Sequence, residues 1–196
     1  GIPYCPVSPA YSLLSQDFAK LRHVCDLLQP GLVFVSDAAA YQRAIDAVLP
    51  AETPLISVRG HVPGRAQVSF ASLLQTAAGS AADQAFMATG PDSIAKFLFT
   101  SGSTKLPKAV ITTQRMLCAN QQMLLQTFPV FGEEPPVLVD WLPWNHTFGG
   151  SHNVGIVLYN GGTFYLDEGK PTAQGFAETL RNLKEVSPTA YLTVPK

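Results

Sequence analysis

Residues 97 to 112 read Phe-Leu-Phe-Thr-Ser-Gly-Ser-Thr-Lys-Leu-Pro-Lys-Ala-Val-Ile-Thr, and this stretch decides the fold. An apolar run stops at five small or hydroxylated residues, 100 to 104, which Pro107 and Lys108 soon follow. Hydroxyl groups can donate to phosphate oxygens, and a glycine lets backbone N–H groups approach an anion closely. The stretch therefore predicts a loop that binds the phosphates of a nucleotide.

The alternative reading of the same residues is a mobile linker rich in serine and glycine. A linker fits poorly, because strand-like apolar segments bound the loop on both sides, at residues 94–99 and 109–112. Two common phosphate loops are excluded by spacing. The Walker loop ends in Gly-Lys-Ser/Thr, whereas residues 107–109 read Pro-Lys-Ala, and the dinucleotide loop needs three glycines where only Gly102 stands.

Strand and helix signals alternate along the chain, which predicts an α/β fold built from parallel βαβ units. We expect helices over 15–28, 38–48, 114–127, 149–159 and 173–186, a strand with its exit loop over 2–9, and strands over 32–36, 54–58, 94–99, 109–112, 137–141, 163–166 and 190–195. Residues 59–93 show little periodicity, so we place a boundary near residue 90. The prediction is a first α/β lobe over 1–90 and a phosphate-loop and acyl-pocket lobe over 91–196.

Composition argues for a protein with its own core and against several classes of partner. The chain has 196 residues, a net charge of −1 and 46% hydrophobic residues, with no basic stripe for nucleic acid. No apolar run approaches the roughly 20 residues of a membrane span, and the first residues form no signal peptide, so we expect a cytoplasmic protein. Its three cysteines, Cys5, Cys25 and Cys118, lie too far apart for a paired metal motif and are expected to be reduced.

A second candidate site covers residues 142–149, Leu-Pro-Trp-Asn-His-Thr-Phe-Gly, where a buried strand ends and a helix begins. Ligand contacts in open α/β sheets usually lie at such a point. A lone histidine there is more often an ordinary residue of the core or surface. His146 is accompanied by Trp141, Trp144 and Phe148, whose rings form an apolar wall suited to an aromatic or extended acyl group.

A serine hydrolase is the competing enzyme class, because residues 149–152 read Gly-Gly-Ser-His, part of a nucleophile elbow. The pattern Gly-x-Ser-x-Gly fails at Asn153, and no histidine follows His152 to complete a triad. The sequence therefore excludes this class.

Residues 100–109 resemble the phosphate loop of the adenylate-forming superfamily, which includes acyl-CoA and aryl-CoA ligases, luciferases and peptide-synthetase adenylation domains. The signature of that family reads Thr-Ser-Gly-Ser-Thr-Gly-x-Pro-Lys-Gly, and this chain departs from it at Lys105 and Ala109. Pro143, His146 and Gly149 also fit the family pattern Pro-x-x-His-x-x-Gly. Residues 140–170 and 6–12 are most similar to feruloyl-CoA synthetases, enzymes of phenylpropanoid catabolism.

This resemblance implies a two-step ligase that uses ATP, Mg²⁺ and coenzyme A to convert a feruloyl-like carboxylic acid into its thioester. It implies that ATP is bound by Thr100, Ser101, Gly102, Ser103, Thr104 and Lys108, and that the acyl pocket is lined by Trp144, His146, Phe148, Gly149 and Gly150. Lys108 would order the loop or meet phosphate, and His146 would stand as a gate between the carboxylate and the nucleotide. No residue is predicted to be a metal ligand.

Lys105 stands where the family has glycine, and two consequences are open. If the position needs a positive φ, lysine costs about 1 kcal/mol or more and stiffens the loop. If it does not, the added charge aids phosphate binding.

Further family segments do not occur in the 196 residues: a Tyr-Gly-x-Thr-Glu segment, a ribose-binding aspartate, a hinge and a C-terminal domain with its lysine. We expect a part of the N-terminal domain, incomplete at both ends, that does not complete adenylation by itself. The alternative is a non-catalytic nucleotide- or acyl-binding remnant of the same fold, for which Lys105 and Ala109 are the support.

Overall fold

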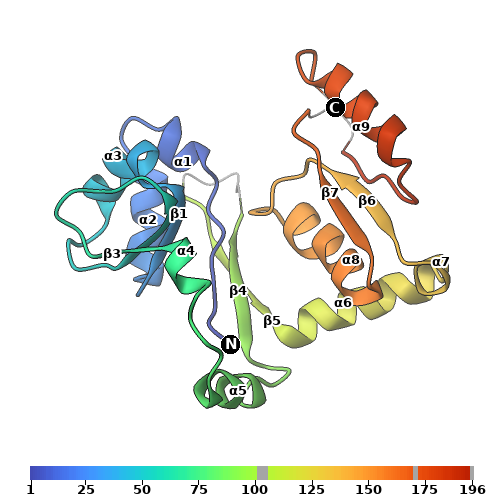
Figure 1. The fold of residues 1–196 in the computed structure, drawn as a ribbon, viewed down its shortest axis with the longest axis horizontal. Coiled ribbons are helices and arrows are strands. Elements are labelled where there is room, and N and C mark those ends of the chain that lie inside the picture. Colours follow the sequence, from blue (N-terminus) through green and yellow to red (C-terminus); the bar gives the residue numbers. More distant parts are fainter. Residues whose placement is uncertain (101–105, 170–171, 195–196) are drawn as a thin grey trace. The chain divides into compact units, whose positions relative to one another are not determined.

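The computed structural model of the chain describes residues 1–100, 106–169 and 172–194, and its helices and strands are labelled in Figure 1. The chain divides into two compact units. Unit one comprises Gly1–Pro6, Met87–Thr100 and Ala109–Lys196, and unit two comprises Val7–Phe86 and Ser101–Lys108. The simpler division into lobes 1–90 and 91–196 stays a prediction.

Unit two is built on a parallel sheet in the order β1-β2-β3, which comprises β1 (Val33–Asp37), β2 (Leu55–Arg59) and β3 (Gln67–Ser69). Its helices are α1 (Ala10–Leu13), α2 (Ala19–Leu28), α3 (Ala38–Val48), α4 (Phe70–Leu73) and α5 (Ser80–Met87), the last ending at the border of the unit. Buried Ile45 of α3 and Leu49, which follows that helix, pack with Leu55 of β2 in the core of this unit.

Helix α3 has its predicted bounds because its start is capped. The Asp37 carboxylate accepts from the backbone N–H groups of Ala39 and Ala40. Helix α2 begins later than predicted, at Ala19. The side chain of Ser15 accepts from the Phe18 N–H, and Phe18 takes a left-handed φ of 54°, which separates α2 from the short α1.

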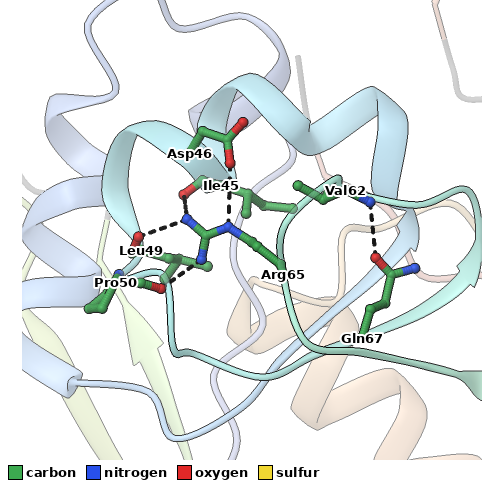
Figure 2. A network of polar contacts seen from close by, with 7 residues as sticks. All are labelled: Ile45, Asp46, Leu49, Pro50, Val62, Arg65 and Gln67. Atoms are coloured by element: carbon green, nitrogen blue, oxygen red, sulfur yellow. Dashed lines mark hydrogen bonds and ion pairs between the residues drawn. The ribbon is translucent and has the colours of Figure 1, made fainter.

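The end of α3 is capped by a side chain from outside the helix, Arg65. Its guanidinium donates to the carbonyl oxygens of Ile45 at 3.3 Å, Leu49 at 2.9 Å and Pro50 at 2.6 Å, and pairs with Asp46 at 3.3 Å. Figure 2 shows these carbonyl groups converging on the guanidinium. The carbonyls of Ile45 and Pro50 also accept from the backbone N–H groups of Leu49 and Thr53, so Arg65 adds a second donor to both and binds the Leu49 carbonyl just past the end of the helix.

Unit one contains two strand pairs, β4 (Ile94–Phe99) with β5 (Ala109–Thr113), and β6 (Val137–Asp140) with β7 (Thr163–Leu166). Its helical elements are α6 (Gln114–Thr127), α7 (Val130–Glu133), the π-helix η1 (Phe148–Asn153), α8 (Val154–Asn160) and α9 (Phe176–Val186). Helices α6 and α8 pack together, as Figure 1 shows, and Ile156 and Val157 of α8 cover Leu138 of β6. Among the described residues, no helix combines the length and the apolar character needed to cross a membrane.

The predicted parallel pairing is found in β1-β2-β3 and in β6–β7, but β4 and β5 are antiparallel. A parallel connection needs a crossover of about a dozen residues or more, and residues 100–108 are too few. Phe99 lies opposite Ala109 in the register, so the two ends of the predicted phosphate loop meet.

Two terminal strands predicted from sequence are only isolated bridges, Tyr4 with Lys96 and Leu138 with Ala190. The predicted helix over 149–159 begins instead as the π-helix η1. Residues 59–93, which gave no clear pattern, form β3, α4 and α5. These three elements are short, and short elements leave little periodicity to detect.

Candidate functional site

The arms of the predicted phosphate loop are described, but residues 101–105 are not. Ser101, Gly102, Ser103 and Thr104, and the departure at Lys105, therefore keep their roles as predictions. Thr100 and Lys108, at the two ends, are exposed.

The second arm of the predicted loop, residues 106–108, contacts helix α2. Pro107 is buried, and its carbonyl oxygen lies 2.9 Å from Nε2 of His23. Since a carbonyl can only accept, His23 donates from Nε2. This contact places the residue before Lys108 against a helix of unit two.

The segment after β6 makes a tight turn that positions His146. The His146 N–H donates to the Pro143 carbonyl at 3.0 Å, and the His146 carbonyl accepts from the Gly150 N–H at 2.9 Å as η1 begins. The exposed His146 ring accepts at Nδ1 from the Phe148 N–H at 3.2 Å. A neutral His146 therefore carries its proton on Nε2, which is a donor.

The two predicted pocket glycines allow close approach of backbone to backbone. A Cβ on Gly149 would lie 2.7 Å from the Pro143 carbonyl oxygen, and one on Gly150 would overlap the Trp144 carbonyl oxygen. Both contacts are with the turn that carries His146. Any larger residue at either position would push η1 away from this turn.

The aromatic residues near His146 have separate ring partners. Trp144, 51% exposed, meets Phe164 of β7 edge to face at 6.0 Å, whereas Phe148 meets the ring of His152 at 5.1 Å. Phe148 and His152 thus form one face of η1.

Sequence reasoning missed a buried polar chain that ends at His152. Asp140 and Asn153 are 3% and 0% exposed. The Asp140 carboxylate accepts from the Leu142 N–H at 3.0 Å and from Nδ2 of Asn153 at 3.1 Å. Burial raises the pKa of Asp140, Asp167 adds to the rise, and hydrogen bonds from Leu142, Asn153 and Trp141 oppose it.

These hydrogen bonds determine which ring nitrogen of His152 carries the proton. Because Asn153 gives its amide nitrogen to Asp140, only its amide oxygen faces His152, and that oxygen lies 2.8 Å from Nδ1. The Nδ1 atom must therefore carry the proton, and Nε2 of the neutral ring presents a lone pair. The signal in the sequence was an aspartate at a strand end followed by His-Asn in the next helix.

No metal site accompanies these groups in the described part of the chain. Nowhere in residues 1–100, 106–169 and 172–194 do three or more His, Cys, Asp or Glu side chains gather closely enough to hold an ion.

The family profile described as AMP-binding enzyme matches residues 1–196, the whole chain. The chain belongs to the AMP-binding enzyme family. The chain is similar to the medium-chain-fatty-acid–[acyl-carrier-protein] ligase TtuA of Teredinibacter turnerae (strain ATCC 39867 / T7901). The two are 39% identical over 71 residues, which cover 36% of this chain and 11% of that protein.

Solved structures of other proteins share the fold. The adenylation domain of a keto acid-selecting NRPS module bound to keto acyl adenylate has a TM-score of 0.68 at 20% identity, over 97% of this chain and 32% of that one. A malonyl-CoA ligase with methylmalonyl-CoA and AMP bound has a TM-score of 0.61 at 22% identity, over 94% of this chain and 33% of that one. The chain thus spans about a third of these structures and about a tenth of TtuA.

Proposed function

We propose that this chain is part of an AMP-forming ligase that activates an aromatic, feruloyl-like carboxylic acid and joins it to coenzyme A. The observation that carries the proposal is the family match over residues 1–196, which includes the predicted phosphate loop. The pairing of Phe99 with Ala109 supports it, because it closes residues 100–108 into a loop between two strands.

The reaction has two displacements. In the first, a carboxylate oxygen attacks the α-phosphorus of ATP, the bond to the β,γ-phosphates breaks, and pyrophosphate leaves. In the second, the thiol of coenzyme A loses its proton and attacks the acyl carbon, the carbon–oxygen bond breaks, and AMP leaves. No bond to protein forms, so catalysis rests on positioning and on stabilising charge.

The described residues fit these tasks in part. Lys108 supplies a cation at the end of the loop, and His146 supplies an N–H donor at Nε2 that suits a carboxylate or phosphate oxygen. Mg²⁺, which prefers oxygen ligands, is proposed as a companion of the ATP phosphates.

His152 favours an aromatic acid that carries a hydroxyl group. Its Nε2 presents a lone pair, and a phenolic hydroxyl is a donor that such an atom binds. Phe148, packed against the same ring, offers an apolar surface for the aromatic part of the acid.

A second candidate function is activation of a fatty acid, and its support is the 39% identity with TtuA, whose name specifies medium-chain fatty acids and acyl carrier protein. A non-catalytic remnant that binds nucleotide or acyl groups is the third candidate, and Lys105 and Ala109 favour it.

The test is an assay of the full-length protein with ATP, coenzyme A or acyl carrier protein, and a panel of hydroxycinnamic, benzoic and C6–C16 aliphatic acids. We expect AMP, pyrophosphate and a hydroxycinnamoyl-CoA in equal amounts. Preference for an aliphatic acid would replace the aromatic proposal by the fatty-acid one. Nucleotide binding without AMP release for any acid would favour the remnant.

A further inference from the structure

Lys96 of β4 is a buried cation that contacts the acyl segment. It is 2% exposed, and its Nζ donates to the Gly150 carbonyl oxygen at 2.6 Å. Within residues 1–100, 106–169 and 172–194 no carboxylate forms an ion pair with it. Burying an ammonium group without an opposite charge costs free energy, and here burial lowers the pKa of Lys96.

A ring compensates part of this cost. Nζ of Lys96 lies 5.9 Å from the ring centroid of Tyr4, in cation–π geometry. Tyr4 is held beside β4 by two backbone hydrogen bonds, from its N–H to the Ala95 carbonyl and from the Phe97 N–H to its own carbonyl. The ring and the ammonium are therefore fixed by the same strand.

The carbonyl that Lys96 binds belongs to η1, and the next two carbonyls also have side-chain donors. Nε2 of Gln121, on α6, donates to the carbonyls of Ser151 at 3.3 Å and His152 at 3.4 Å. Gln121 is 4% exposed, and the absence of a side chain on Gly155 leaves room for its amide. Two buried side chains from two elements thus bind three consecutive carbonyls of a π-helical turn, a type of turn that is frequent at functional sites.

We propose that Lys96 is a positioning residue for the acid substrate: it holds the Gly150 carbonyl and thereby fixes the π-helical turn that carries Phe148 and His152. The inference rests on the proposed function for the identity of that substrate. Lys96 does not itself touch the acid, because Tyr4 and the η1 backbone cover its ammonium. The strand that holds it continues directly to Thr100, so β4 serves both the phosphate loop and the acyl turn.

The experiment compares Lys96→Met, which keeps the length but removes the charge, with Lys96→Arg, which keeps a cation. Lys184→Met is the matched control, because Lys184 lies exposed on α9 of the same unit. In the full-length protein we expect Lys96→Met to raise KM for the acid about tenfold or more and to leave KM for ATP within about twofold. Amide hydrogen exchange over residues 148–154 should quicken about tenfold in Lys96→Met, recover in Lys96→Arg, and stay unchanged in Lys184→Met.

Equal behaviour of Lys96→Met and Lys184→Met would overturn the proposal, and so would faster exchange with an unchanged KM for the acid. If the unmodified protein releases no AMP with any of the acids tested, the proposed function fails. Amide exchange over residues 148–154 still decides whether Lys96 holds the turn. Should Lys96→Met be insoluble, Lys96→Gln is measured with the same expectation. Insolubility of both would overturn the proposal, since Lys96 would then be needed for folding rather than for positioning.

Discussion

At the scale of residues, the candidate site depends on two histidines whose protons are set by their neighbours. The Phe148 N–H donates to Nδ1 of His146, whereas Nδ1 of His152 faces the amide oxygen of Asn153. One neutral ring therefore presents a donor at Nε2 and the other an acceptor. The same side chain six residues apart serves opposite purposes because the partners differ.

Replacing His152 by leucine should reduce the preference for a hydroxylated acid. We expect kcat/KM for a 4-hydroxycinnamate to fall about tenfold relative to unsubstituted cinnamate, which is the worth of one hydrogen bond. Steady-state assays of both acids measure the ratio. His61→Leu, at an exposed position of unit two, should leave the ratio unchanged, and an unchanged ratio in His152→Leu would argue that His152 does not contact the acid.

Asp140 should make stability depend on pH. Its pKa is raised by folding, so the folded state binds this proton more tightly than the unfolded state does. Its contribution is therefore fully present below the ordinary carboxyl pKa of about 3.9 and is lost as the pH rises through the raised value. Urea unfolding from pH 4 to pH 7 should show the native protein losing stability relative to Asp140→Asn, with Asp83→Asn, at an exposed position, as a flat control.

At the scale of elements, η1 and α3 show how helix carbonyls are satisfied from outside. Lys96 and Gln121 bind carbonyls within η1, and Arg65 binds those at the end of α3. In each case the donor comes from another element, and its side chain is largely buried. Removing such a donor takes a hydrogen bond from each carbonyl, and where no other donor replaces it the loss costs more than the bond itself gained.

Arg65→Met should therefore destabilise unit two by about 2–3 kcal/mol, the cost of losing hydrogen bonds from a charged group to the carbonyls of Ile45, Leu49 and Pro50. Chemical denaturation followed by circular dichroism measures the change. Arg59→Met is the control, because the Arg59 side chain is 77% exposed and its ion pair with Asp37 is at the surface. Similar midpoints for the two variants would refute the capping role.

At the scale of the whole molecule, the chain passes between its two units four times, after residues 6, 86, 100 and 108. Residues 1–6 belong with β4 rather than with the helices that follow them in sequence. The predicted phosphate loop, residues 100–108, joins two strands of unit one while its second arm contacts α2 of unit two.

Because residues 1–6 belong with β4, we expect a substitution near the N-terminus to change the stability of β4. Tyr4→Pro removes the N–H that donates to the Ala95 carbonyl and the ring beside Lys96. We expect amide exchange in β4 to quicken about tenfold, with α2 and α3 unchanged, as measured by mass spectrometry. Tyr4→Ala, which keeps the N–H, should show a smaller effect, and faster exchange confined to α2 and α3 would instead support a continuous lobe over 1–90.

Several elements could be predicted with their observed bounds: β4, β7, α3 and α6. Each has strong local signals, such as the Asp37 cap of α3 and the Thr113 cap of α6. The start of α2 could not, because the left-handed Phe18 interrupts a pattern that reads as one helix. At the candidate site, His146, Phe148 and the glycines were predicted from the sequence, whereas Lys96, Gln121 and the Asp140–Asn153–His152 chain were not.

The sequence alone determined the family and the predicted phosphate chemistry, since a loop of contiguous small and hydroxylated residues needs no distant partner to be recognised. Tertiary structure decided the antiparallel pairing of β4 with β5, the proton positions of His146 and His152, and the burial of Lys96. Lys96 meets Gly150 across 54 positions of the chain. Such a contact forms only when packing brings remote segments together. The same packing buries the Lys96 ammonium, which then needs a hydrogen-bond partner.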